Sequence, residues 1–244
     1  MVPRYYAPIE VFLFSKEEII MKFFNLAIDG PAGAGKSTIA KKVANELGYI
    51  YVDTGAMYRA VALFYLNKKV DVTNEDEVNK YINDVNVEFK IIDGVIRLFL
   101  NDSDVTDVIR TPEVSDAASK VSVHKLVRER MVAMQQDIAK KNNIVMDGRD
   151  IGTVVLPNAD VKIYLTASVE ERANRRYKEN IEKGIECDLE QIKKDIEERD
   201  YRDMHRDISP LKEAEDAIHL DSTGMEIDEE VAYILEFCKH ARGE

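Results

Sequence analysis

The segment Gly30-Pro-Ala-Gly-Ala-Gly35-Lys36-Ser37 constrains the fold of this chain more than any other feature. It matches the loop G-x-x-x-x-G-K-[ST], in which glycines let backbone N–H groups surround phosphate oxygens. An apolar run from Phe23 to Asp29 precedes it, and apolar residues at helical spacing follow from Lys36 to Leu47. This strand–loop–helix context predicts a phosphate-binding loop for a nucleoside triphosphate. The predicted binding residues are Gly30, Pro31, Ala32, Gly33, Ala34, Gly35, Lys36, Ser37 and Thr38.

Short apolar runs alternate with helical patterns along the rest of the chain. The runs are 49–52, 144–146, 161–166 and 217–220, and helical patterns cover 57–66 and 121–140. With the first run they give five strand candidates, which predicts an α/β fold with a five-stranded parallel, doubly wound sheet flanked by helices. Ligands of such sheets bind at the carboxyl ends of the strands.

Two segments stand outside this alternation. NVEFKII and VIRLFL flank Asp93-Gly94, a pair suited to a tight turn, so they predict a β-hairpin inserted at about residues 80–120. Residues 1–21 precede the first strand and lack a strongly basic start and a small-residue cleavage site. We therefore expect residues 1–21 to be an extension outside the fold, and residues 22–244 to form the functional domain.

The charge balance limits the possible partners. The formal net charge is -12 and the pI is near 5.0, which disfavours tight binding to nucleic acid. Two distant cysteines and no apolar run of membrane-spanning length indicate a cytoplasmic protein with free thiols and no membrane partner. The sequence contains no coiled-coil pattern that would indicate an oligomer, so a monomer is expected.

Three later motifs carry charged residues, and the first two directly follow the second and third predicted strands. They are DTGAMYR at 53–59, DGRD at 147–150 and RDYRDMHR at 199–206. Arg172, Arg175 and Arg176 lie at i, i+3 and i+4, hence on one helix face.

Together with RTPEV at 110–114, GRDIGTVV at 148–155 and SPLK at 209–212, these motifs resemble bacterial-type cytidylate kinase from about Lys22 to the C-terminus. The resemblance implies a P-loop kinase that transfers the γ-phosphoryl group of ATP to CMP and dCMP, with Mg²⁺, as a monomer. It also implies that the hairpin insertion closes over the monophosphate and that residues 170–189 form a helical lid.

The resemblance assigns roles to individual residues. Arg59, Arg149 and Arg206 would grip the acceptor phosphate, with Thr54 and Asp53 beside it. Ser119, Arg128 and Asp150 would read cytosine, and Arg199 and Asp203 would hold the sugar. Lys36, Arg149, Arg175 and Arg176 would be catalytic, and Ser37 and Asp147 would organise the metal.

Several alternatives stay open from sequence alone. Adenylate or shikimate kinase is the closest enzymatic alternative, and a regulatory GTPase or a nucleic-acid ATPase is the alternative from another class. A GTPase would need a guanine-reading N-K-x-D element, which the sequence lacks. Arg172 could equally belong to a solvated face, Asp53 could merely cap a helix, and Asp200 and Arg202 are expected to be structural or surface residues.

Overall fold

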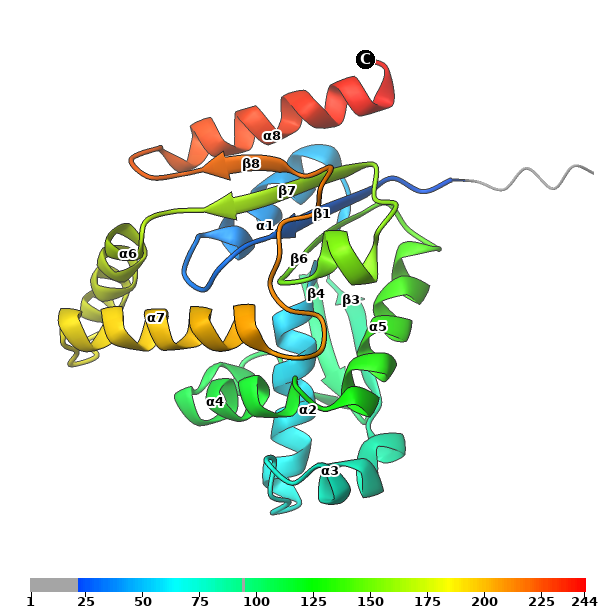
Figure 1. Cartoon of the computed structure of the whole chain (residues 1–244). Helices are drawn as coiled ribbons and strands as arrows, with labels where there is room; N and C mark the ends of the chain where they lie inside the picture. Colours follow the sequence, from blue (N-terminus) through cyan, green and yellow to red (C-terminus); the bar gives the residue numbers. More distant parts are fainter. Residues whose placement is uncertain (1–21, 94) are drawn as a thin grey trace, which may run out of the picture.

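The computed structural model describes residues 22–93 and 95–244, and a five-stranded parallel sheet lies at its centre (Figure 1). All five predicted strands are confirmed, and they are ordered β2-β6-β1-β7-β8. Their bounds are β1 (Asn25–Asp29), β2 (Ile50–Asp53), β6 (Ile144–Gly148), β7 (Val161–Thr166) and β8 (Ile218–Asp221). β1 is central, so the phosphate loop that follows it starts in the middle of the sheet.

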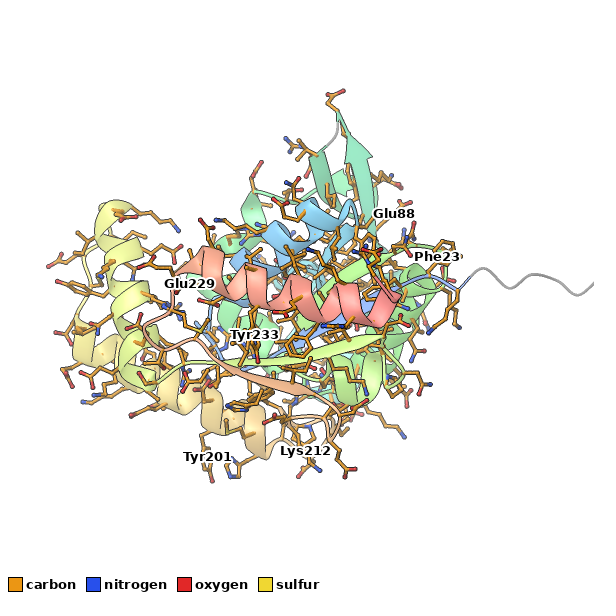
Figure 2. The ribbon with its side chains drawn as sticks, turned by 90° about the horizontal axis from the view of Figure 1, so that it is seen from above. Phe23, Glu88, Tyr201, Lys212, Glu229 and Tyr233 are labelled. Atoms are coloured by element: carbon orange, nitrogen blue, oxygen red, sulfur yellow. The ribbon has the colours of Figure 1, made fainter. Side chains whose placement is uncertain are left out.

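Alternate side chains of the strands enter two separate cores. Ala27 and Met146 pack on one face with the insertion and with the helices α2 (Thr54–Asn67), α4 (Pro112–Val121) and α5 (Lys125–Ala139). Leu26, Ile28 and Val145 pack on the other face with α1 (Lys36–Leu47) and α8 (Ile227–Arg242). Figure 2 shows α8, which carries Glu229 and Tyr233, lying over this second face.

The helices follow the apolar spacing of the sequence. α1 covers Lys36 to Leu47, the range that the apolar spacing predicts, and its caps, Gly35 and Gly48, both have left-handed backbone. The bounds are α1 (Lys36–Leu47), α2 (Thr54–Asn67), α3 (Glu75–Tyr81), α4 (Pro112–Val121), α5 (Lys125–Ala139), α6 (Val169–Glu182), α7 (Leu189–His205) and α8 (Ile227–Arg242). Shorter turns are η1 (Ile82–Asp84), η2 (Val108–Arg110) and the π-helical η3 (Ile151–Val155).

The predicted hairpin is confirmed as β3 (Val87–Ile92) and β4 (Val95–Leu100), which pair antiparallel and continue to β5 (Ser103–Asp104). Its turn includes Gly94, which lies outside the described residues. The single helix expected over 121–140 is wrong at its start. The chain turns at Ser122 and His124, so that α4 ends at Val121 and α5 begins at Lys125.

α6 and α7 pack against each other at one side of the sheet (Figure 1) and share a small core of Ala173, Ile192 and Ile196. Ser168 caps α6 by accepting from the Glu171 N–H at 3.1 Å. The reciprocal bond of a capping box is not formed, because the Glu171 carboxylate accepts from Arg175 at 2.9 Å instead.

The expected extension, residues 1–21, lies outside the described residues. None of the helices over residues 22–93 and 95–244 is both long and apolar enough to cross a membrane.

Candidate active site

The phosphate loop wraps from β1 into α1. A Cβ on Gly30 would lie 1.9 Å from the backbone oxygen of Leu165, so only glycine fits where the loop leaves the sheet. Gly33 and Gly35 both have positive φ, which turns the backbone of the loop toward the start of α1. Lys36 is buried and its Nζ donates to the Pro31 oxygen at 2.7 Å. Burial, and next the charge of Arg149, lower the pKa of Lys36.

Asp147 lies near the end of β6, beside Asp53 of β2 in the strand register. Its Oδ2 accepts from the Ser37 hydroxyl and its Oδ1 from the Tyr51 hydroxyl, each at 2.9 Å. Burial, and next the charge of Asp53, raise the pKa of Asp147 to about 6. A carboxylate and a hydroxyl are oxygen ligands of the kind Mg²⁺ takes, so the pair Ser37 and Asp147 fits that ion.

Asp53 sits at the N-terminus of α2 and has two kinds of partner. It caps the helix by accepting from the Ala56 N–H at 2.7 Å, and it accepts from Arg59 at 3.0 Å. The capping alternative is therefore confirmed, and the same carboxylate also orients an arginine. Thr54 donates to the Asp147 backbone oxygen at 2.7 Å, which ties the start of α2 to β6.

Arg149 follows β6 and lies next to α7. Its Nε donates to Asp203 at 2.8 Å, and Arg199 lies one turn before Asp203 on the same helix. Burial, and next the charge of Arg149, lower the pKa of Arg199 to about 10. The positive charges of Arg149 and Arg199 thus act on each other, and a bound anion would reduce the repulsion between them.

Asp150 joins Arg128 and Arg206. Arg128 and Asp150 form a buried ion pair, and Arg206 lies 3.5 Å from the other carboxylate oxygen. The Arg128 guanidinium also lies over the Tyr58 ring, 5.7 Å from its centroid. Arg206 therefore contacts Asp150, one of the predicted base-reading residues.

A cavity of about 300 Å³ connects these groups. Seven cationic and four acidic side chains line it, although the whole protein carries a net charge of -12. The charged lining is Lys36, Arg59, Arg128, Arg149, Arg176, Arg199, Arg206, Asp53, Asp147, Asp150 and Asp203. This local excess of positive charge favours a ligand with several negative charges.

Four of the lining side chains have buried polar atoms without a hydrogen-bond partner among the residues that the structure describes. They are Arg59 Nε, Arg128 Nε, Arg199 Nε and Tyr58 Oη. Buried polar groups are nearly always paired, so these atoms indicate a polar ligand or water in the cavity.

The structure brings most of the predicted site residues to this cavity, including Thr54, Ser119 and loop residues Ala32 to Thr38. Gly30, Pro31 and Arg175 do not line it. Arg175 instead donates to the Ser222 oxygen at 2.9 Å, beside the β8–α8 connection.

Sequence reasoning missed Tyr51, Tyr58, Ser115 and Ser122. Tyr58 stands inside the DTGAMYR motif, next to Arg59, but carried no assigned role. Ser115 and Ser122 lie four residues before and three after Ser119, so they would share its face on a helix. Predicting α4 from Thr111-Pro112, a good helix start, would have revealed both.

Comparison with known proteins finds one family whose members are similar to this chain over most of its length. A sequence model of the family described as cytidylate kinase matches residues 26–240. A cytidylate kinase of Bacillus cereus (strain G9842) is 54% identical over 214 residues, which are 88% of this chain and 95% of that protein. A cytidylate kinase of Bacillus thuringiensis (strain Al Hakam) is 52% identical over the same shares of both chains.

Among solved structures, an uncharacterized protein from Eubacterium ventriosum ATCC 27560 is similar with a TM-score of 0.50. The identity is 12%, and the match covers 88% of this chain and 97% of that chain. This likeness concerns the fold alone.

Proposed function

The chain belongs to the cytidylate kinase family, and on that premise we propose that it transfers the γ-phosphoryl group of ATP to CMP and dCMP. The products are ADP and CDP or dCDP. The observation that carries the proposal is the cavity in which the phosphate loop faces an arginine-rich half that ends in the buried Arg128–Asp150 pair.

The donor half is the phosphate loop. Residues 30–38 surround the ATP phosphates with backbone N–H groups and the N-terminus of α1, and Lys36 lies against the β- and γ-phosphates. Ser37 and Asp147 would hold Mg²⁺, which neutralises charge on the phosphates when bound. Tyr51 fixes the Asp147 carboxylate for that role through its hydrogen bond.

The acceptor half divides into a phosphate end and a base end. Arg59 and Arg149 bind the monophosphate, because the planar guanidinium makes bidentate contacts with phosphate oxygens. Their carboxylate partners, Asp53 and Asp203, hold both guanidinium groups in place. Arg199 and Asp203 bind the sugar hydroxyls.

At the base end, Asp150 accepts from the N4 amino group of cytosine and Arg128 donates to N3. Ser119 on α4 and Arg206 on the far side of Asp150 complete this end. Uracil presents a carbonyl to the carboxylate and an N–H to the arginine, so both contacts become repulsive.

The reaction needs no general base, since the attacking phosphate oxygen is already anionic. Catalysis is positioning and neutralisation of charge on the transferred group. Arg176 lines the cavity and Arg175 lies beside it on α6, so a lid over residues 170–189 brings both to the transferred phosphoryl group on closure. The insertion, about residues 80–120, closes over the acceptor at the same time.

An acceptor panel tests this function. Purified protein is given ATP and Mg²⁺ with CMP, dCMP, UMP, AMP or shikimate, and ADP formation is followed in a coupled assay. We expect turnover with CMP and dCMP to exceed that with the other three acceptors. Preference for AMP or shikimate, or ATP hydrolysis stimulated by polynucleotide without an acceptor, would contradict it.

A further inference from the structure

Arg172 and Asp200 form a buried ion pair outside the cavity lining. Arg172 Nη1 lies 2.5 Å from Asp200 Oδ2, and the two residues are 4% and 7% exposed. Arg172 comes from α6 and Asp200 from α7, the two helices at the side of the sheet. The sequence offered a solvated helix face for Arg172, and its burial shows that alternative to be wrong.

The pair holds one residue of the phosphate loop from both sides. Arg172 Nη1 donates to the Ala32 oxygen at 2.9 Å, and Asp200 Oδ1 accepts from the Ala32 N–H at 3.1 Å. Ala32 is itself buried, so both of its backbone polar groups depend on this pair.

The packing of the loop depends on the same arginine. A Cβ placed on Gly33 would lie 3.4 Å from Arg172 Cβ, which means that the loop rests directly on the Arg172 side chain. Arg172 is also anchored to the end of β7 through its Nε, which donates to the Ala167 oxygen at 2.9 Å. Arg172 therefore connects the phosphate loop, the first turn of α6 and the end of β7.

Stability alone does not account for an ion pair in this place. A buried ion pair is often no more stabilising than apolar residues of the same volume, because both charges must leave water. Its fixed geometry, in contrast, specifies the direction of each backbone group it binds. The Ala32 peptide is one of those groups, and it belongs to the segment that surrounds phosphate.

We propose that Arg172 and Asp200 are positioning residues, which hold the phosphate loop in its ATP-binding shape and anchor α6 to that loop. The inference rests on the proposed function. Arg175 and Arg176 follow Arg172 by one turn of the same helix, so the anchor also sets where these two arginines lie relative to the bound phosphates.

Direct binding measurements separate this role from a merely structural one. Asp200→Asn keeps the shape of the side chain but removes its charge, and Arg172→Met removes the guanidinium while keeping an unbranched chain. We expect both variants to bind ATP about tenfold or more weakly, the change that corresponds to losing one hydrogen bond to a charged group. The affinity for CMP alone should stay within about twofold, since the acceptor contacts are untouched.

Calorimetric titrations of the full chain with ATP alone and with CMP alone give both constants, and a thermal midpoint is recorded for each variant. Glu198→Gln on α7 and Lys178→Met on α6 are matched controls, since both side chains are exposed and change charge in the same way. If Arg172→Met fails to fold, Arg172→Lys retains the charge without the planar fork, and we expect ATP affinity between those of the wild type and Asp200→Asn.

Two outcomes are distinguishable. Folded variants that bind ATP and CMP as tightly as the wild type, or that lose both affinities equally, would overturn the positioning role and leave a structural ion pair. A wild-type protein that binds no ATP would instead contradict the proposed function.

Discussion

Tyr51 Oη donates a hydrogen bond to Asp147 Oδ1 at 2.9 Å, while the other oxygen of that carboxylate accepts from Ser37. Tyr51 lies on β2 and outside the sequence motifs, yet it fixes the rotation of the carboxylate that faces the phosphate loop. A carboxylate that rotates freely binds a metal less well, because part of its orientation must be fixed on binding.

Tyr51→Phe should therefore raise the Mg²⁺ concentration needed for half-maximal activity by about tenfold. Turnover at saturating Mg²⁺ should change much less, because the ligands themselves remain. Rates measured over a Mg²⁺ series at fixed ATP and CMP test this. Tyr49→Phe, which removes a hydroxyl from the adjacent turn, is the control. An unchanged Mg²⁺ dependence would contradict the role of Tyr51 in orienting the Asp147 carboxylate.

Lys36→Met should remove most of the turnover and leave the fold intact. Loss of one charge that stabilises the transition state costs about 10²–10³ in kcat. Methionine keeps the length of the buried side chain, so the thermal midpoint should stay near that of the wild type. Lys42→Met removes an exposed lysine of the same helix and should behave like the wild type. Near-full activity of a folded Lys36→Met protein would refute the donor-site assignment.

Asp150→Ala should narrow the ratio of kcat/KM for CMP over UMP by roughly ten- to a hundredfold, since one good base contact is worth about 1–3 kcal/mol. The family resemblance assigns Arg206 to the acceptor phosphate, and a purely phosphate-binding role would make Arg206→Ala weaken both acceptors equally. Because Arg206 lies 3.5 Å from Asp150, we now expect it to narrow the ratio as well.

Arg59→Ala is the contrast to Asp150→Ala and should slow CMP and UMP by the same factor, because it contacts the phosphate end of the cavity. Steady-state kinetics with both acceptors measure all three variants. Equal slowing of CMP and UMP by Asp150→Ala would make Asp150 a structural partner of its two arginines.

Glu230 predicts a pH dependence of stability. The side chain is 1% exposed and its Oε2 has no partner among the described residues. Burial raises its pKa from 4.5 to about 7, against a smaller opposing effect of Arg175. The folded state thus favours the protonated acid. Its stabilising contribution is complete below about pH 4.5 and is lost as the pH rises through 7.

Glu230→Gln removes this titration. Its free energy of unfolding relative to the wild type should be constant below about pH 4.5 and should then rise, by up to about 3 kcal/mol at pH 8. Urea denaturation of both proteins at four pH values gives the difference in their free energies of unfolding. Groups that titrate alike in both proteins cancel in this difference. A difference that is flat with pH would show that Glu230 is solvated.

Local patterns predicted the elements of the sheet well. The run ending at Asp29, the loop and the helix from Lys36 to Leu47 follow from apolar spacing and two glycines, which are local signals. Gly184, which has a positive φ, lies in the connection between α6 and α7, and glycine at a helix end is likewise a local signal.

Pairings between distant residues were not readable in this way. The Arg128–Asp150 and Arg172–Asp200 pairs join residues 22 and 28 positions apart, and only the packing of helices against the sheet brings them together. The π-helical turn at Ile151–Val155 was also missed. It is held by Asp29, which accepts from the Ile151 and Gly152 N–H groups at 2.8 and 2.7 Å, more than a hundred residues away.

The two cores on opposite faces of the sheet have a consequence for how such an enzyme can diversify. The helices α2, α4 and α5, which carry Arg59, Ser119 and Arg128, pack in one core. The helix α1, which directly follows the phosphate loop, packs in the other. Substitutions that reshape the acceptor end are therefore buffered from the donor end by the intervening strands. Directed evolution toward a new acceptor should draw its tolerated changes mainly from α2, α4 and α5, with the side of α1 and α8 left unaltered.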